Sequence, residues 1–361
     1  MGMRAGTLAV ADYRNFERFE LGLDQGVTIL IGRNAAGKTN LIEALQLLTA
    51  GQSFRKPRSC ELVREGCERG HIELSLSGDG RALTTGCSFE DGKRSFLLNG
   101  KHVQAAGVRG ILPSILFCPD HLDMVKRSAS VRRDALDSFG VQLSGRYAKL
   151  VSSYERIVTQ RNSLLKDPDC TPDLLISWDD SLVAAGTPLL MHRVSLLERI
   201  RAHLVEVYTT IAPGERADAV YISSLGDLPA GRDEISKRFH EVLDEGREED
   251  LRRGVTLAGP HRDDILFTID GRPARAYASQ GQQRSIVLAW KIAEVEVTRD
   301  VLGKEPILLL DDVMSELDAE RREAVVSFVE GEMQTVITTT NLGYFSERIL
   351  DGAKVVQIGD E

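Results

Sequence analysis

The feature that most constrains the fold is an eight-residue glycine-rich loop near the start of the chain. Its residues are Gly32, Arg33, Asn34, Ala35, Ala36, Gly37, Lys38 and Thr39, which fit the pattern G-x-x-x-x-G-K-[ST]. The loop follows a β-rich apolar run, Val27–Ile31, and precedes a helix predicted over 40–48, which is the context that a phosphate-binding loop requires. Backbone N–H groups and Lys38 would hold the phosphates of ATP, and the Thr39 hydroxyl would be a ligand of Mg²⁺. The loop therefore predicts an α/β nucleotide-binding domain.

Two adjacent carboxylates follow a buried strand that we predict over 307–310. Asp311 is placed to hold Mg²⁺. Asp312 is the candidate base for the attacking water, and Lys38 would assist catalysis at the γ-phosphate. Taken alone, a buried strand that ends in a solvated turn would show the same pattern. Together with the loop at 32–39, the pattern predicts ATP hydrolysis.

The segment 278–284 determines the class of nucleotide-binding protein. It resembles the ABC signature L-S-G-G-Q, retaining Ser279, Gly281 and Gln282, with Gln280 where the first glycine usually lies. Because it opens a predicted helix, its hydroxyl and free N–H groups can receive a phosphate, although an ordinary serine N-cap would look the same. In the ABC superfamily that phosphate belongs to ATP held by the opposing subunit. The order of loop, signature and acidic pair along the chain favours the ABC interpretation.

Two further segments resemble ABC-type heads, with departures from the usual pattern. The sequence S-E-L-D, ending at Asp318, resembles the D-loop S-A-L-D, so we include Asp318 among the candidate nucleotide-binding residues. The strand predicted at Thr335–Thr339 is followed by Thr340 and Asn341, where such heads normally place a histidine that senses the γ-phosphate. Thr340 or Asn341 would have to take that role. Asp312 stands where glutamate is usual, and its side chain is one methylene shorter.

The arrangement of predicted elements divides the chain. An antiparallel pattern over 71–103 is followed by long helical patterns at 129–166 and 178–212, and by a polar helix at 232–253. We expect an ABC-type α/β head, with a mixed sheet that carries the loop and an antiparallel β-subdomain, split by a mostly helical second domain. The expected boundaries are 1–125 and 254–361 for the head and 126–253 for the insertion.

Over nearly its whole length the sequence resembles the RecF family of bacterial recombination mediators. The matching segments are D-Y-R-N-F at 12–16, G-Q-S-F-R at 51–55, F-C-P-D-H-L at 117–122, R-R and L-D at 132–137, G-P-H-R-D-D at 259–264 and S-Q-G-Q-Q-R at 279–284. The resemblance implies an SMC-like head without long coiled-coil arms, ATP-dependent homodimers and a weak, DNA-stimulated ATPase. It also implies binding to double-stranded or gapped DNA, and cooperation with RecR and RecO in loading RecA. The implied processes are DNA replication, repair, recombination and the SOS response.

Alternatives from other classes remain to be weighed. The nucleotide-binding subunit of a membrane transporter has its signature much closer to the phosphate-binding loop, whereas here Ser279 follows Thr39 by 240 residues (279 − 39). A complete SMC protein would need hundreds of additional heptad residues. The third alternative is a non-enzymatic scaffold that ATP opens and closes, in which Asp312 hydrolyses ATP too slowly to matter.

Net charge limits how this chain could bind DNA. With 45 basic and 54 acidic residues the net charge is −9, so positive charge must be concentrated locally to hold a phosphate backbone. The densest basic clusters contain Arg55, Lys56 and Arg58, and Lys126, Arg127, Arg132 and Arg133. A solvated or ion-paired helix face would also explain each cluster. No base-reading motif accompanies them, so any contact is expected to be independent of DNA sequence.

The remaining features suggest a cytoplasmic protein with no membrane segment. The apolar runs are too short to span a bilayer, and the charged N-terminal region does not resemble a secretory signal. The five scattered cysteines predict free buried thiols in a reducing compartment. His261 and Arg262 could be a zinc or catalytic pair, but without further His or Cys nearby a structural or nucleotide-proximal role is favoured.

Overall fold

The computed structural model describes residues 2–329 and 333–359, so the outermost residues of the expected head and its residues 330–332 lie outside the described chain. The chain forms two compact units, one of Met1–Leu122 with Val287–Glu361 and the other of Asp123–Ile286. The expected second boundary, at 253, lies 33 residues earlier than the structural one (286 − 253). The difference arises because β10 (Asp264–Ile269) pairs with β9 (Ala217–Ile222) and therefore belongs to the second unit.

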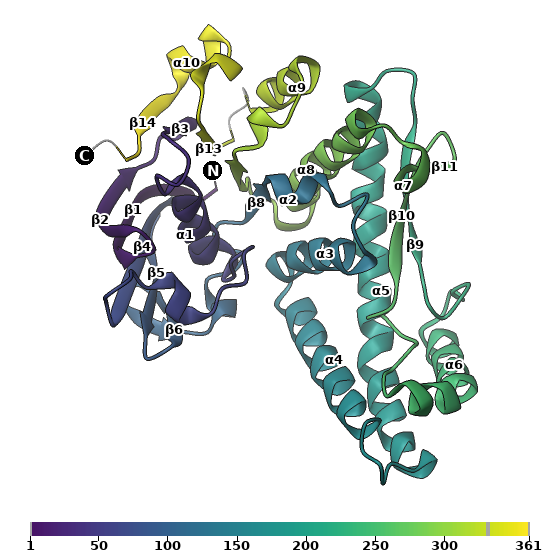
Figure 1. Ribbon diagram of the computed structural model, residues 1–361. Helices are drawn as coiled ribbons and strands as arrows, with labels where there is room; N and C mark the ends of the chain where they lie inside the picture. Colours follow the sequence, from purple (N-terminus) through teal and green to yellow (C-terminus); the bar gives the residue numbers. More distant parts are fainter. Residues whose placement is uncertain (1, 330–332, 360–361) are drawn as a thin grey trace. The chain divides into compact units, whose positions relative to one another are not determined.

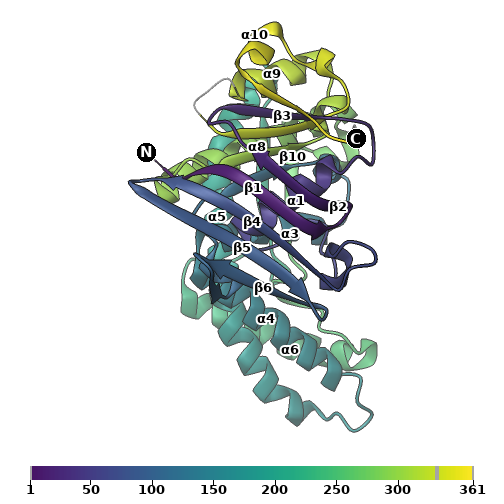
Figure 2. The same cartoon turned by 90° about the vertical axis from the view of Figure 1, so that its left-hand side faces the viewer.

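The first unit contains an antiparallel sheet that extends well beyond the predicted region (Figure 2). Its strands follow the order β2-β1-β4-β5-β6-β7. They are β1 (Arg4–Tyr13), β2 (Phe16–Gly22), β4 (Arg69–Gly78), β5 (Arg81–Glu90), β6 (Lys93–Leu98) and β7 (Lys101–Val103). The buried side chains of β4 alternate with exposed ones, as expected for a sheet with one face on the core.

A second, parallel sheet in this unit carries the phosphate-binding loop. Its order is β14-β3-β13-β12-β8. The strands are β3 (Val27–Ile31), β8 (Ser114–Phe117), β12 (Ile307–Asp311), β13 (Thr335–Thr339) and β14 (Lys354–Gln357). The fully buried runs of β8, β12 and β13 are typical of parallel strands covered on both faces. The predicted ABC-type α/β head with an antiparallel β-subdomain is confirmed, but the sheet that carries the loop is parallel throughout rather than mixed.

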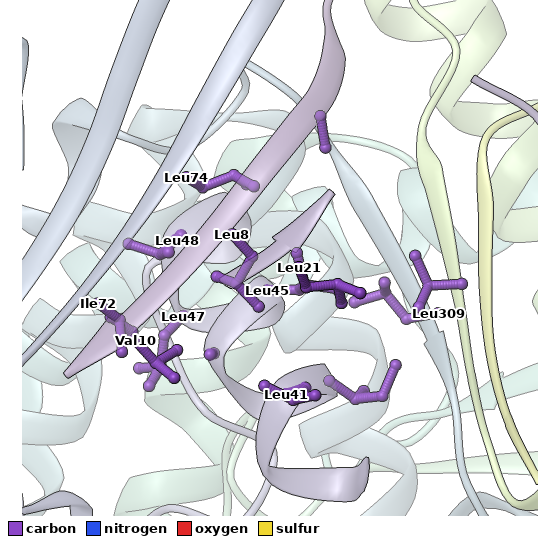
Figure 3. Close-up of a cluster of buried hydrophobic side chains, with 14 of the residues drawn as sticks. Leu8, Val10, Leu21, Leu41, Leu45, Leu47, Leu48, Ile72, Leu74 and Leu309 are labelled. Atoms are coloured by element: carbon purple, nitrogen blue, oxygen red, sulfur yellow. The ribbon is translucent and has the colours of Figure 1, made fainter. Parts of the chain in front are cut away.

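Helix α1 (Lys38–Ala50) lies between the two sheets, contacting β4 and β5 of one and β8, β12 and β13 of the other. Figure 3 shows Leu41, Leu45 and Leu48 of this helix packed among side chains of the antiparallel sheet and β12. Almost every residue of α1 is buried, including the polar residues Glu43, Gln46 and Thr49, so the helix is enclosed on all sides. The packing therefore fixes the helix end that adjoins the loop at 32–39.

Short elements complete the first unit. They are η1 (Ser59–Leu62), η2 (Ala105–Gly107), α2 (Pro119–Leu122), η3 (Val313–Ser315), α9 (Ala319–Val329), η4 (Leu342–Tyr344) and α10 (Glu347–Gly352). Cys87 and Cys118 are buried as expected, but Cys60 is exposed, so burial of all five thiols was wrong.

The second unit is built around one long helix, α5 (Pro172–Ile211), against which α4 and α6 pack (Figure 1). Its other elements are α3 (Ala129–Leu143), α4 (Gly145–Leu164), α6 (Arg232–Arg253), β11 (Arg272–Pro273) and α7 (Ala274–Tyr277), and α8 (Gln280–Leu302) begins here. A three-stranded sheet, β11-β10-β9, accompanies the helices. No helix in the described part of the chain is long and apolar enough to cross a membrane.

The helix predicted over 129–166 is interrupted. Ser144 has extended backbone angles (φ −148°, ψ 118°), and its hydroxyl accepts a hydrogen bond from the Tyr147 backbone N–H at 3.3 Å. Ser144 therefore ends α3 and caps α4, a role that the continuous apolar spacing on either side concealed.

Candidate nucleotide site

At two positions of the loop at 32–39, only glycine fits the backbone and its surroundings. Gly37 has φ 106°, and a Cβ there would lie 2.6 Å from Phe16. A Cβ on Gly32 would lie 2.3 Å from the Ile358 carbonyl oxygen. Both contacts are far inside van der Waals distance, so both positions need glycine. Gly37 supplies no side-chain cap to α1, which leaves the helix N-terminus suited to an anion.

Lys38 folds across this loop. It is 6% exposed, and its Nζ donates to the carbonyl oxygens of Gly32 at 2.7 Å and Arg33 at 2.9 Å. Burial lowers the pKa of its ammonium, while Asp312 and Asp311 act in the opposite direction. The charge is therefore held beside the loop and the two carboxylates, where phosphates would bind.

Thr39 and Asp311 meet although they are 272 residues apart in sequence. The Thr39 hydroxyl donates to Asp311 Oδ1 at 2.9 Å, and the Thr338 hydroxyl donates to the same oxygen at 2.8 Å. Burial raises the pKa of the Asp311 carboxyl, against the effect of both hydroxyls. Hydroxyl and carboxylate oxygens are hard donors that fit Mg²⁺, which takes few protein ligands and completes its shell with phosphate and water. The described residues contain no cluster of three or more His, Cys, Asp or Glu that could hold a metal alone.

Asp312 is held in an unusual conformation. Its φ of 53° lies in the left-handed region, and its backbone N–H donates to the Thr338 hydroxyl at 2.9 Å. Its Oδ1 is buried and has no hydrogen-bond partner among the described residues. Burial raises the pKa of this carboxyl. A buried carboxylate oxygen without a partner is costly, and at a strained residue it indicates a place for water or ligand.

The signature segment at 279–282 forms a closed capping box. The Ser279 hydroxyl accepts from the Gln282 backbone N–H at 3.2 Å, and the Gln282 side-chain oxygen accepts from the Ser279 N–H at 2.8 Å. Ser279 and Gln280 are exposed, at the start of α8. The serine is thus an N-cap, as the simpler interpretation held, and it is also presented to solvent. The N-cap interpretation and the phosphate-binding interpretation of Ser279 are therefore compatible.

The candidates after β12 and β13 occupy local turns. Asp318 Oδ1 accepts from the Arg321 backbone N–H at 3.0 Å at the start of α9. The Asn341 side-chain oxygen accepts from the Gly343 N–H at 2.8 Å and so closes a turn of its own. Thr340 and Asn341 are both exposed. Exposure therefore does not distinguish the two candidates for the place of the sensor histidine, although Asn341 already uses its side-chain oxygen in the turn.

A cavity beside the loop was not predicted from composition or spacing. It has a volume of about 520 Å³ and is lined by Arg14, Asn15, Asn40, Glu61, Val63, Arg64 and Glu65. Asn15 joins it to the loop, donating from Nδ2 to the Ala36 carbonyl oxygen at 3.0 Å. Arg14 is fixed by the fully buried Glu43, to which it donates twice, at 3.0 and 2.9 Å. The run D-Y-R-N-F was the only sequence signal for this region.

The first basic cluster is exposed, with its charges partly satisfied. Arg55 donates to the Asn40 side-chain oxygen at 2.8 Å, and Arg58 pairs with Glu61 at 2.9 Å. Lys56 is exposed and has φ 49°. Arg58 is therefore both ion-paired and exposed, and its contact with DNA stays a prediction.

The second basic cluster requires a correction. Lys126 and Arg127 are exposed, but Arg132 is only 2% exposed. Its guanidinium donates to both Asp264 oxygens, at 2.6 and 2.9 Å, and to carbonyl oxygens of the preceding loop. Arg133 is half-buried and donates to the Asp263 carbonyl oxygen at 2.5 Å. We therefore remove Arg132 from the candidate DNA contacts, because counting charges cannot separate a buried arginine from an exposed one.

Replacing Arg132 with alanine should destabilise the second unit by about 3–5 kcal/mol, because it leaves the Asp264 carboxylate and several carbonyls without their donor. Urea unfolding measures the loss. The control Arg127→Ala removes an exposed charge whose pair with Asp123 is long, 3.3 Å, and should cost about 0.5 kcal/mol or less. Equal stability of the two variants would contradict the structural role of Arg132.

His261 makes structural hydrogen bonds. Its Nδ1 lies 2.8 Å from the Tyr154 hydroxyl and its Nε2 lies 3.0 Å from the Thr256 carbonyl oxygen. Burial lowers the pKa of the imidazole to about 4. Both nitrogens are therefore used by a neutral ring, which favours the structural interpretation over zinc binding or catalysis.

Comparison with known proteins covers almost the entire chain. The model of the RecF/RecN/SMC N-terminal domain family matches residues 6–357. The chain is 36% identical over 354 residues to the DNA replication and repair protein RecF of Gloeobacter violaceus, covering 96% of this chain and 94% of that protein. It is also 36% identical to the protein of the same name from Heliobacterium modesticaldum, covering 99% and 97%.

Solved structures agree with these relatives. A structure of the recombination mediator RecF with ATP, from the RecFOR pathway, superposes with a TM-score of 0.88 at 30% identity, over 96% of this chain and 94% of that one. An Smc head bound to the C-winged helix domain of ScpA gives a TM-score of 0.58 at 14% identity, over 99% and 94%. The second likeness concerns the fold alone.

Proposed function

Because the chain belongs to the RecF family, we propose that it is an ATP-dependent DNA-binding protein of replication and recombinational repair. The observation that carries the proposal is the contact of Thr39 with Asp311, since it joins the phosphate-binding loop to the acidic strand end in a Mg²⁺-type site. The relatives' names and the ATP-bound neighbour support the same assignment. ATP turnover measured with and without duplex DNA tests it, and we expect weak turnover that DNA stimulates.

In this proposal the residues of the loop at 32–39 bind and orient ATP. Their backbone N–H groups and the N-terminus of α1 would contact phosphate oxygens, and Lys38 would exchange its two carbonyl partners for the β- and γ-phosphates. Thr39 and Asp311 would hold Mg²⁺, which offsets negative charge on the phosphates. The cavity lined by Arg14, Asn15 and Asn40 would receive the base or ribose of the nucleotide.

Hydrolysis requires a base for water, and Asp312 is our assignment. Its buried Oδ1 has no hydrogen-bond partner in the described part of the chain, and its raised pKa makes it a better proton acceptor than an ordinary aspartate. Aspartate is shorter than the glutamate that is usual at this place. Either the attacking water must therefore lie closer to the backbone, or the rate of ATP hydrolysis must be lower. We expect the lower rate, and in the limit of no hydrolysis the protein would be a scaffold controlled by ATP binding alone.

The signature supports a homodimer that forms when ATP binds. Ser279 and its neighbours are exposed at a helix N-terminus, which suits contact with the γ-phosphate of ATP bound to a second copy. Asp318, Gln280 and Gly281 would belong to the same interface. By analogy with the family, RecR and RecO would be partners, and the assembly would assist RecA loading on double-stranded or gapped DNA in the cytoplasm.

DNA affinity should fall steeply with salt and vary little between unrelated duplexes, because contacts to phosphates release counterions and carry no code. The exposed residues Arg55, Lys56, Arg58, Lys126 and Arg127, with half-buried Arg133, are the candidates. A logarithmic plot of affinity against salt should lose about one unit of slope in Lys126→Ala if that lysine contacts a phosphate. A flat salt response of the wild type, or strong preference for one duplex, would contradict the proposal.

A further inference from the structure

A chain of hydrogen bonds connects the signature to a residue that no motif indicated. The Gln282 side chain accepts from the Ser279 N–H through its oxygen, and its Nε2 donates to Glu215 Oε1 at 2.8 Å. The other carboxylate oxygen of Glu215 accepts from the Tyr208 hydroxyl at 2.8 Å. Tyr208 is fully buried near the end of α5. The chain thus runs from a buried tyrosine to the exposed serine of the signature.

Glu215 is itself held by backbone on both sides. Its N–H donates to the Ala212 carbonyl oxygen at 3.2 Å, across a turn in which Gly214 has φ 92°. The next residue, Arg216, exchanges backbone bonds with Asp270: its N–H donates to Asp270 Oδ1 at 3.0 Å, and its carbonyl accepts from the Asp270 N–H at 2.9 Å. The backbone at Glu215 is therefore anchored to the end of α5 and, through Asp270, to the turn that follows β10.

This arrangement determines which hydrogen-bonding groups of the signature remain available to a ligand. Gln282 uses both ends of its amide inside the protein. The Ser279 oxygen accepts from the Gln282 N–H, so its O–H proton remains for an incoming acceptor such as a phosphate oxygen. If Gln282 lost Glu215, its amide could rotate or reverse, and the bond that fixes the Ser279 backbone would weaken. Bonds to an ionised acceptor are roughly twice as strong as neutral ones, so the loss of this one should matter.

We propose that Glu215 is a positioning residue for the signature: through Gln282 it holds Ser279 in the orientation that receives the γ-phosphate of a second copy's ATP. The hydrogen bonds that link Glu215 to Gln282, and Gln282 to Ser279, are present in the structure. Their effect on binding of the γ-phosphate rests on the proposed ATP-dependent dimer. Glu215 touches neither nucleotide nor reacting atoms in this assignment, and it acts only by orienting Gln282.

Three variants separate positioning from general stability. Glu215→Ala removes both acceptor oxygens. Glu215→Gln keeps the size and can accept from Gln282 while donating to the Tyr208 oxygen, so it should restore most of the function. Glu248→Ala is the matched control, an exposed glutamate on α6 of the same unit.

The first measurement is amide hydrogen exchange of the segment 277–284 in the nucleotide-free protein. Glu215→Ala should raise the exchange rates of Ser279 and Gln282 by about 10-fold, and the other two variants should resemble the wild type. The second measurement is sedimentation velocity with ATP, where Glu215→Ala should weaken dimerisation by about 10-fold with ATP affinity of the monomer unchanged.

Unchanged exchange in Glu215→Ala would overturn the inference, as would a Glu215→Gln variant that behaves like Glu215→Ala. If the wild type fails to dimerise with ATP, the proposed function fails, yet the exchange rates still decide whether Glu215 orders the signature. The two ideas can therefore fail separately.

Discussion

Replacing Asp312 with asparagine should reduce ATP turnover by about 10²–10⁴-fold while leaving ATP affinity close to that of the wild type, because the amide cannot accept the proton of water. The substitution suits the site conformationally. Asp312 has φ 53°, and asparagine tolerates the left-handed region as well as aspartate does. Lost activity can then be attributed to chemistry rather than to backbone strain. Single-turnover hydrolysis and nucleotide binding, measured on the same preparation, test this expectation.

A nearby carboxylate provides the control for this experiment. Glu316 is exposed and raises the pKa of Asp312 through its charge, without being placed as the base. Glu316→Gln makes the same carboxylate-to-amide change and should alter turnover only a few-fold. The variant Asp312→Asn should also accumulate in its ATP-bound form. Turnover within a few-fold of wild type in that variant would assign the base to another residue.

The parts of the site that sequence could predict are those that are local in the chain. The strand Val27–Ile31, the loop at 32–39 and the start of α1 follow one another directly, so glycine spacing and apolar runs were sufficient. The pairing of Thr39 with Asp311 followed only from the known order of motifs. Local spacing alone does not bring together residues 272 positions apart.

Each failure has a physical cause. Arg132 and Arg127 are equally basic in sequence, but only Arg132 is buried against Asp264, a partner 132 residues away. Ser144 ends a helix inside a continuous apolar pattern, because its hydroxyl caps the next helix. Glu215 lies in a short loop, and only the fold brings it to Gln282. Arg132 and Glu215 therefore escaped prediction because their partners are distant in sequence, whereas the Ser144 cap is local and was concealed by the apolar pattern around it.

Replacing Ser279 with arginine should leave ATP binding to the monomer intact, weaken ATP-dependent dimerisation by about 100-fold or more, and abolish nearly all hydrolysis. The signature lies 240 residues beyond Thr39 in sequence (279 − 39), and its capping role at α8 leaves the proton of the exposed Ser279 hydroxyl unused. In a two-fold dimer, each signature completes the ATP site of the other copy, so ATP binds the dimer preferentially and must favour it by linkage. ADP lacks the γ-phosphate and should favour the dimer much less.

Arginine also removes the N-cap of α8, which costs about 1 kcal/mol, so that effect must be separated from the effect at the interface. Ser279→Asp keeps a capping oxygen but brings negative charge toward the γ-phosphate, and it too should stay monomeric. Ser279→Thr keeps both the cap and the hydroxyl and should dimerise with ATP. Sedimentation velocity with ATP, ADP and no nucleotide distinguishes the four proteins. If the arginine or aspartate variant dimerises as readily as the wild type, or the wild type stays monomeric with ATP, then Ser279 does not contact a partner's nucleotide.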